Sequence, residues 1–421
     1  MADTTTTTPD FTDAAATAEF LTDAYKRLRD VVSARVSDIN NTTYPVLPPT
    51  AAILETIRLT VGDGHDTTTT PAPALQTLDT PLGPAGTVDH LLDVVVPSLN
   101  GQSVSPRYYG FVTGGVHPVA EAADNVVSAL DPNVQVHSAT HSGSTLVEDA
   151  ALRMLVSLLG LDEDEDEDRD YDDEEEEEEG DNEVVENPLK RSWSTGARTF
   201  TTGATASNIM GLACGREAVI SSRLPDEETV SEMGLLAACQ EAGIREIQVL
   251  TSMGHSSLSK AASIVGLGHR AVKELRLSEA EPWRLDLDAV ERELVRGESD
   301  GVASIIVVSA GEVNTGRFAT SGYEDMARLR KLADRYKAWI HVDGGEFFLL
   351  PGQLFLCFTV YPSRHHNIDK LAICKTAMGI FARALPKTIE FADLHQGAAG
   401  LELADSITGD GHKLLNVVCC C

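Results

Sequence analysis

The sequence has too few basic residues to suit a nucleic-acid or anionic-membrane partner. Its 421 residues include 33 Lys and Arg against 65 Asp and Glu, a formal net charge of −32, whereas both kinds of partner require a positive protein surface. Residues 162–186 alone hold 19 acids and one base, Arg169. Such a low-complexity segment cannot collapse against itself, so we interpret it as a solvated acidic insertion rather than a docking segment.

Cysteines are few, and their spacing suggests neither a disulfide framework nor a zinc site. The sequence has no CxxC pair, which favours a reducing, cytoplasmic compartment. His365 and His366 with Cys357 and Cys374 fit no established zinc spacing, so we expect no metal. The terminal cysteines lack the context of a lipidation signal. The seven cysteines are Cys214, Cys239, Cys357, Cys374, Cys419, Cys420 and Cys421.

Long hydrophobic runs are missing as well. The most apolar stretch, residues 347–361, is interrupted by Pro351 and Gly352 and is shorter than the roughly 20 residues that a spanning helix needs. The N-terminus lacks the basic and apolar regions of a secretory signal. We therefore expect a soluble cytoplasmic protein that does not bind membranes.

The chain divides into a tail, a helical segment and a long α/β region. Residues 1–17 are rich in Thr, Ala and Asp and predict a disordered tail, and residues 18–104 show helical spacing of apolar side chains. From residue 198 onward, β-like runs alternate with helical ones, which is typical of a mostly parallel sheet covered by helices. The expected strands are 245–251, 303–309 and 338–343, and the expected helices include 206–221, 256–265 and 322–336.

Four motifs place polar residues where strands end or helices begin. Thr205 and Ser207 in TTGATASN open a helix, where N–H groups can bind a phosphate, although ordinary N-capping is the better explanation of such residues taken alone. His255 stands where a strand is followed by a helix. Asp343 ends an apolar strand, where its partly buried carboxylate would need a cation or donors. Lys413 follows a glycine-containing turn. Each alone has an ordinary structural explanation, but together they supply what pyridoxal phosphate requires: a phosphate seat, a stacking imidazole, a carboxylate and an amine.

These motifs resemble those of the group II pyridoxal-phosphate-dependent amino-acid decarboxylases, which include the aromatic-amino-acid and glutamate decarboxylases. The resemblance begins at SPRYYGFVTGG (residue 105) and runs through HSGSTLVEDAALRMLVSLLGL, TTGATASNIMGLACGRE, GHSSLSKAASIVGLG, SAGEVNTGRF and HVDG to ADSITGDGHKLLN. It implies an α/β large domain of pyridoxal-phosphate fold type I, similar to aspartate aminotransferase, over residues 105–418. It also implies a homodimer with active sites at the subunit interface.

The resemblance assigns a role to each motif residue and implies the decarboxylation of an L-amino acid to the amine and CO2. Lys413 corresponds to the Schiff-base lysine, Asp343 to the partner of the ring nitrogen and His255 to the stacked imidazole. The other cofactor positions are Thr205, Ala206, Ser207, Asp410 and His412. The substrate-pocket motif contains Thr113, Tyr109 and Phe111, and its aromatic character favours an aromatic amino acid over glutamate.

The sequence departs from the family pattern in three places. Glu312 and Val313 stand where relatives such as the glutamate decarboxylases have Thr. Residues 345–376 separate HVDG from its expected continuation, AMGIFARALP, without a helical or strand period, so we interpret them as a translated unspliced intron. After Lys413, the chain ends in the aberrant residues 419–421, where the family continues with a mobile loop and a C-terminal small domain. We therefore expect a truncated chain with impaired activity, and sequencing of the transcript tests the splicing hypothesis.

Two other functions fit the same motifs. A non-catalytic decarboxylase-like remnant could act by dimerising with an intact paralogue, which the lack of any full-length transcript would favour. A pyridoxal-phosphate carbon–carbon lyase of the sphingosine-phosphate type also carries GHSS-like and DGHK-like motifs, although YYGFVTGG favours the decarboxylases.

Overall fold

The computed structural model divides the chain into two compact units, Met1–Gly115 and Val116–Cys421. The division lies after Gly115 rather than at residue 104, where the sequence predicted the helical segment to end. The structure describes residues 11–40, 47–61, 82–104, 115–132, 140–161, 193, 196–226, 228–312, 315–344, 379–385 and 387–411. The acidic segment 162–186, the segment 345–376 and residues 419–421 lie outside these ranges.

The first unit is helical, as predicted. It contains α1 (Ala14–Asn40), α2 (Thr50–Val61), α3 (Gly83–His90), a π-helical turn (Leu91–Val95), α4 (Val96–Ser98) and a 3-10 turn (Gln102–Val104). Helix α1 begins inside the predicted tail of residues 1–17, because the Asp13 carboxylate accepts a hydrogen bond from the Ala15 N–H at 2.9 Å and caps the helix. Residues 14–17 are therefore helical.

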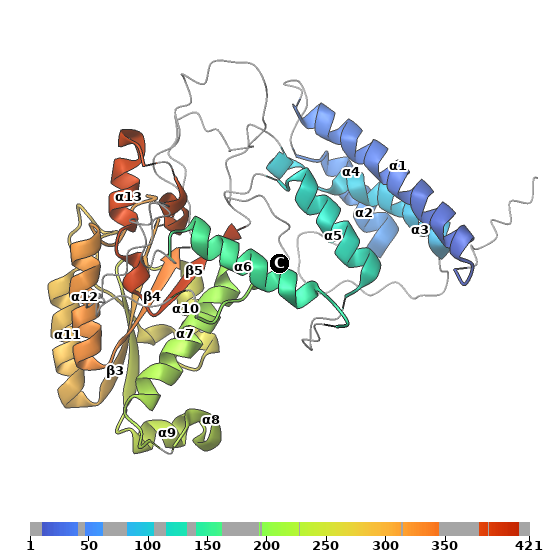
Figure 1. Cartoon of the computed structure of the whole chain (residues 1–421). Helices are drawn as coiled ribbons and strands as arrows, with labels where there is room; N and C mark the ends of the chain where they lie inside the picture. Colours follow the sequence, from blue (N-terminus) through green and yellow to red (C-terminus); the bar gives the residue numbers. More distant parts are fainter. Residues whose placement is uncertain are drawn as a thin grey trace, which may run out of the picture. The chain divides into compact units, whose positions relative to one another are not determined.

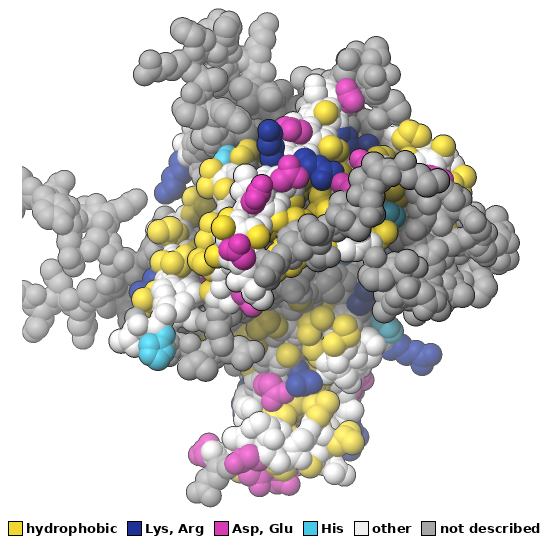
Figure 2. Space-filling view, turned by 90° about the vertical axis from the view of Figure 1, so that its right-hand side faces the viewer, with side chains coloured by type: hydrophobic (Ala, Val, Ile, Leu, Met, Phe, Trp, Pro, Cys, Tyr) yellow, Lys and Arg dark blue, Asp and Glu magenta, His cyan; other side chains and the backbone are white. Residues whose placement is uncertain are grey.

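One face of α1 carries exposed apolar side chains. Leu21, Tyr25 and Leu28 are spaced four and three residues apart, so they lie along one side of the helix, and all three are exposed. Figure 2 shows that hydrophobic side chains also lie between charged ones on the face of the molecule that it presents. The helix is held within its unit by Arg27, which forms an ion pair with Asp89 of α3 at 2.5 Å.

The second unit is built on a parallel sheet of five strands in the order β2-β1-β3-β4-β5. The strands are β1 (Glu246–Thr251), β2 (Val272–Glu274), β3 (Val302–Ser309), β4 (Trp339–Gly344) and β5 (Ser406–Gly409). The α/β fold class and the three predicted strands are confirmed, with ends that differ by one residue. Strands β2 and β5 were not predicted, because three or four residues carry too little periodicity to be recognised.

Helices precede, connect and cover these strands. They are α5 (Pro118–Leu130), α6 (Ser144–Leu158), α7 (Ala204–Ser221), α8 (Val230–Met233), α9 (Leu235–Glu241), α10 (Ser256–Ile264), α11 (Leu287–Asp300), α12 (Tyr323–Tyr336) and α13 (Ala392–Ala398). Short 3-10 turns span His269–Ala271, Gly379–Ala384, Ile389–Phe391 and Leu401–Leu403. None of the helices in the described ranges is both long and apolar enough to cross a membrane.

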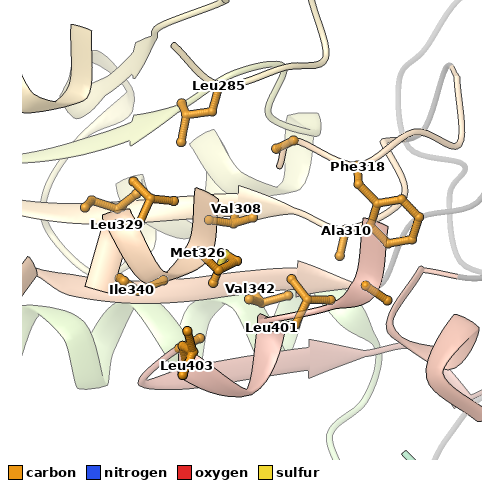
Figure 3. Close-up of a cluster of buried hydrophobic side chains, with 14 of the residues drawn as sticks. Leu285, Val308, Ala310, Phe318, Met326, Leu329, Ile340, Val342, Leu401 and Leu403 are labelled. Carbon is orange, nitrogen blue, oxygen red and sulfur yellow. The ribbon is translucent and has the colours of Figure 1, made fainter. Parts of the chain in front are cut away.

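The two faces of the sheet are covered by different helices (Figure 1). Because side chains alternate along a strand, Val308 and Ile340 point into a cluster with Met326 and Leu329 of α12 (Figure 3). Ile305 and Val307 point the opposite way, into a cluster with α7 and α10. Both faces are therefore closed by helices, and ligand access is left to the carboxyl edge of the strands.

A buried arginine on α12 ties the first cluster to the start of β5. Arg330 is 2% exposed and contacts Asp405 at 2.8 Å and Asp334 at 2.6 Å. Asp405 also accepts the Ile340 N–H at 2.8 Å. The ion pair therefore fixes the entry of β5 beside β4.

Candidate active site

Asp343 occupies the carboxyl end of β4 at the carboxyl edge of the sheet. It pairs in register with Ser309 at the end of β3 and with Thr408 on β5. The residue is 2% exposed. A carboxylate buried this deeply is costly without donors or a cation, and ligands of such sheets bind just beyond the strand ends.

Asn208, near the start of α7, donates directly to this carboxylate. Its Nδ2 lies 2.9 Å from Asp343 Oδ2 and 3.5 Å from Ser257 Oγ of α10. Its Oδ1 lies 3.0 Å from His341 Nε2 of β4. One fully buried amide therefore connects α7, α10 and β4.

Helix α7 approaches β4 closely because glycines face the strand. A Cβ added to Gly211 would lie 2.5 Å from His341 Nδ1, and one added to Gly215 would lie 2.8 Å from Trp339 Cδ1. Real Cβ atoms do not come this close, so a larger residue at either position would push the helix and strand apart. The two glycines are four residues apart, on the same side of the helix.

His255 lies at the junction between the β1 loop and α10, as the sequence predicted. Its Nδ1 accepts a hydrogen bond from the Ser257 N–H at 3.2 Å and lies 2.7 Å from Ser257 Oγ. The imidazole is therefore the N-cap of α10, and it is half-buried. The cap uses Nδ1 and fixes the ring plane, so the structural role and a stacking role are compatible.

The predicted phosphate seat lies at the start of α7. Thr201 Oγ1 lies 2.8 Å from Ser207 Oγ, and the N–H groups of Ala206 and Ser207 donate to the Gly203 carbonyl within the first turn. Gly203 has φ +130°, a conformation that favours glycine. Thr205 is exposed. Because the N–H groups of Ala206 and Ser207 are used within the helix, the backbone donors left for a phosphate are the N–H groups that precede them at the start of α7.

Asp410 reaches the same edge from β5. Gly409, its neighbour, pairs in register with Gly344 at the end of β4, so Asp410 follows at the edge where Asp343 lies, and it is half-buried. The structure thus brings together the described cofactor positions around the carboxyl edge. The other predicted positions, Lys413, His412, Thr113, Tyr109 and Phe111, lie outside the described residues.

Glu312, one of the departures from the family pattern, closes the loop after β3. It is buried, and its Oε2 accepts hydrogen bonds from the Thr315 N–H at 2.9 Å and the Thr315 hydroxyl at 3.0 Å. The carboxylate therefore stabilises this turn locally, which gives the substituted loop a structural role.

His341 is a buried neutral imidazole beneath Asp343. It is 1% exposed, and this burial lowers its pKa to about 4. Its Nδ1 lies 2.8 Å from Ser406 Oγ, which in turn accepts the Trp339 indole N–H at 2.9 Å. The ring therefore stays uncharged at neutral pH and is held on both nitrogens.

The sequence interpretation missed Asn208, Ser257 and His341. Two signals were available: an amide is unfavourable inside an apolar helical stretch, and His341 stands two residues before Asp343, which puts both on one strand face. Neither signal names a partner, because the contacts join residues more than 130 positions apart.

Comparisons with known proteins agree with the motifs. No family model matches the chain. L-2,4-diaminobutyrate decarboxylase of Acinetobacter baumannii is 26% identical over 162 residues, which cover 36% of this chain and 30% of the relative. Aspartate 1-decarboxylase of Aliivibrio fischeri is 24% identical over 331 residues, which cover 78% and 48%. The chain therefore spans half or less of the length of these curated relatives, which are amino-acid decarboxylases by name.

Solved structures show the same fold. The glutamate decarboxylase domain of a diaminobutyrate-pyruvate transaminase and L-2,4-diaminobutyrate decarboxylase from Vibrio parahaemolyticus has a TM-score of 0.59 at 19% identity, covering 96% of this chain and 65% of that chain. Oryza sativa TDC with PLP and tryptamine has a TM-score of 0.56 at 17% identity, covering 96% and 64%. The resemblance to the decarboxylase family and the fold class are confirmed.

Proposed function

We propose that this relative of the group II pyridoxal-phosphate-dependent decarboxylases binds pyridoxal 5'-phosphate and converts an L-amino acid to its amine and CO2. The observation that carries the proposal is the buried Asp343 carboxylate at the carboxyl edge of a parallel sheet, near His255 and the start of α7. The curated relatives support the reaction class, and a PLP-containing structure of similar fold supports the cofactor.

The described residues fit this cofactor chemically. The 2%-exposed Asp343 carboxylate favours a positively charged partner, and a protonated pyridine nitrogen is such a partner. The first N–H groups of α7, at Thr205 and its neighbours, suit a phosphate, and the capped ring of His255 suits a planar one. When bound, pyridoxal phosphate supplies an electron sink for the bond that releases CO2.

Lys413 is the proposed anchoring amine. It stands two residues beyond Gly411, the last described residue, in the sequence that follows β5. Asp410 and His412 precede it and complete the proposed cofactor site. In this arrangement Asp343 would hold a proton on the ring nitrogen, His255 would cover the ring, and the start of α7 would hold the phosphate.

For the substrate, we propose an aromatic L-amino acid, with Thr113, Tyr109 and Phe111 lining its pocket. The support is the aromatic character of the motif in which they stand. The curated relatives are named for aspartate and 2,4-diaminobutyrate, which makes these two amino acids the direct competitors in an activity assay.

We further propose that the protein is a cytoplasmic homodimer. Exposed apolar side chains on α5 and α6 support a second copy, because large exposed apolar patches mark interaction surfaces. They are Val119, Val126, Val127 and Leu130 on α5, and Leu146, Val147, Met154 and Leu158 on α6. Light scattering of the purified protein gives the oligomeric state, and Val147→Glu with Met154→Glu should shift a dimer to monomer.

We propose that the segment 345–376 is a translated unspliced intron that impairs cofactor binding by this chain. Strand β4 ends at Gly344, and the segment Gly379–Ala384 packs against β5, the neighbour of β4, with Ala382 in the shared core. The two flanks of the segment therefore meet in one part of the fold, which supports their direct connection in a spliced protein.

The test is cofactor trapping on the full chain and on a form lacking residues 345–376. Each protein is mixed with pyridoxal phosphate, its visible absorbance is recorded, and borohydride reduction is followed by mass mapping, with Lys413→Ala as the control. We expect a label on Lys413 that the control lacks, and CO2 release from an aromatic amino acid in the better-binding form. Absence of the label in both forms would contradict the proposal. A label without CO2 release would favour the non-catalytic remnant, and carbon–carbon cleavage of a phosphorylated long-chain base would favour the lyase.

A further inference from the structure

A continuous line of polar side chains runs beneath Asp343, on the sheet face that α7 covers. Starting from Trp339, the successive partners are Ser406 at 2.9 Å, His341 at 2.8 Å, Asn208 at 3.0 Å and Asp343 at 2.9 Å. Asn208, His341 and Asp343 are each at most 2% exposed. Buried polar groups of this kind are costly unless each is satisfied, so the line is a built feature of the fold.

The chemistry of its two ends sets the direction of every hydrogen bond. A carboxylate only accepts, so the Asn208 amide must present Nδ2 to Asp343 and therefore Oδ1 to His341. His341 Nε2 must then carry the hydrogen, which leaves Nδ1 of the neutral ring to accept from the Ser406 hydroxyl. The Trp339 indole can only donate, and it does so to Ser406.

The same amide also reaches the second position proposed to contact the cofactor ring. Asn208 Nδ2 lies 3.5 Å from Ser257 Oγ, and Ser257 in turn holds His255 Nδ1 through its hydroxyl and its N–H. The amide thus stands between Asp343, on β4, and the Ser257–His255 pair at the start of α10. Gly211 permits this arrangement, because a Cβ there would collide with the His341 ring.

We propose that Asn208 and His341 are positioning residues that hold the Asp343 carboxylate for the ring nitrogen of the cofactor, an inference that rests on the function proposed above. Neither residue touches the reacting atoms. His341 helps to orient the Asn208 amide. Asn208 in turn fixes the rotation of the Asp343 carboxylate and the distance between Asp343 and His255, the residue proposed to stack on the ring. A carboxylate held in this way keeps the ring nitrogen protonated.

Two measurements on the full chain test the cofactor side of the proposal: the dissociation constant of pyridoxal phosphate and the ring-nitrogen shift of bound ¹⁵N-labelled pyridoxal phosphate. Asn208→Leu keeps the size of the side chain and removes its bonds to Asp343 and His341. We expect it to weaken binding by about 10- to 100-fold, the effect of losing a hydrogen bond to a charged group, and to move the ring-nitrogen signal toward the unprotonated value. His341→Gln retains an N–H donor for the Asn208 amide oxygen. It should therefore change the affinity and the ring-nitrogen signal less than Asn208→Leu does.

Gly297→Ala on α11 is the matched control. A Cβ there would lie 2.7 Å from the Val302 carbonyl, so the variant strains the fold far along the chain from this line. It should lower stability while leaving the ring-nitrogen signal unchanged. A wild-type chain that binds pyridoxal phosphate, together with an Asn208→Leu variant of equal affinity and equal signal, would overturn the positioning role alone. Failure of both the full chain and the form lacking residues 345–376 to bind pyridoxal phosphate would overturn the proposed function and this inference together.

A third measurement needs no cofactor and covers the case in which Asn208→Leu does not fold. In protein labelled with ¹⁵N-histidine, the His341 resonances, assigned by their loss in His341→Gln, report which ring nitrogen carries the hydrogen. We expect the Nε2–H form. A hydrogen on Nδ1 would reverse the hydrogen-bond direction and overturn the proposal.

Discussion

Strand β4 has two faces of opposite character. Ile340 and Val342 point into an apolar cluster beneath α12, where they pack with Met326 and Leu329. His341 and Asp343 point toward α7, where hydrogen bonds to Asn208 replace apolar contacts. A six-residue strand thus supplies the core with one set of side chains and the proposed site with the other. Substitutions at adjacent positions of β4 should therefore affect different properties: those on the apolar face should change stability, and those on the polar face should change cofactor binding.

The largest expected loss of stability comes from the buried Arg330 on α12. Arg330→Met removes the partner of Asp405 and should cost about 3 to 5 kcal/mol, because it leaves a partly buried charge uncompensated. Urea unfolding measures the loss. Adding Asp405→Asn to Arg330→Met should restore part of the lost unfolding free energy. If the losses of the two single variants simply added in the double variant, the two side chains would not be energetically coupled.

Shortening the apolar side of β4 should come next. Ile340→Ala leaves a cavity in a fully buried position and should cost about 2 to 5 kcal/mol of unfolding free energy. Pyridoxal-phosphate affinity of the folded protein should stay at the wild-type level. A drop in affinity as large as that of Asp343→Asn would show that the two faces are not separable.

On the polar face of β4, His341 should make the free energy of unfolding depend on pH. His341 has a folded-state pKa of about 4 against an ordinary value of 6.5, so the unfolded chain binds the proton first as the pH falls. Its contribution is complete above pH 6.5 and is lost as the pH falls to 4, a change of about 3 kcal/mol. His341→Asn should lack this component, so the stability difference between wild type and variant should shrink by that amount. If the unfolding free energies of wild type and His341→Asn changed in parallel with pH, the prediction that His341 is buried and neutral would be wrong.

Asp343→Asn should affect binding more than folding. The amide keeps the shape of the side chain and removes the charge that we propose for the ring nitrogen, so affinity for pyridoxal phosphate should fall by about 10- to 100-fold. Fluorescence titration gives the affinity, and thermal unfolding of the cofactor-free protein provides the control. An unchanged affinity would place the ring nitrogen elsewhere.

The smallest effect is expected at the far end of the polar line. Ser406→Ala removes the hydroxyl between Trp339 and His341 and should cost about 1 kcal/mol, the usual net value of one hydrogen bond. Chemical denaturation with replicate curves resolves this difference. A loss as large as that of Ile340→Ala would mean that the hydroxyl supports more of the sheet than its two bonds indicate.

Much of the sheet could be predicted from the sequence, because β1, β3 and β4 are apolar runs with clear ends. Strands β2 and β5 could not, since short strands acquire their conformation from pairing with a neighbour. In the site, Asp343 was predicted by its place at the end of an apolar strand, and His255 by its place between a strand and a helix. The start of α7 was predicted as a phosphate seat, but the N–H groups of Ala206 and Ser207 turn out to close the first helical turn. Asn208 was missed because an amide in an apolar helical stretch indicates a buried contact but does not identify its partner.

The sequence by itself determined the alternation of strands and helices, the family resemblance and the candidate residues, because periodicity and motif order are local properties of the chain. Only the tertiary structure decided which of these residues meet. Asn208 and Asp343 are 135 positions apart, and their contact requires α7 to lie against β4, which Gly211 and Gly215 permit. The physical reason is that packing joins side chains across the fold, whereas hydrophobic patterning reports only the face on which each side chain lies.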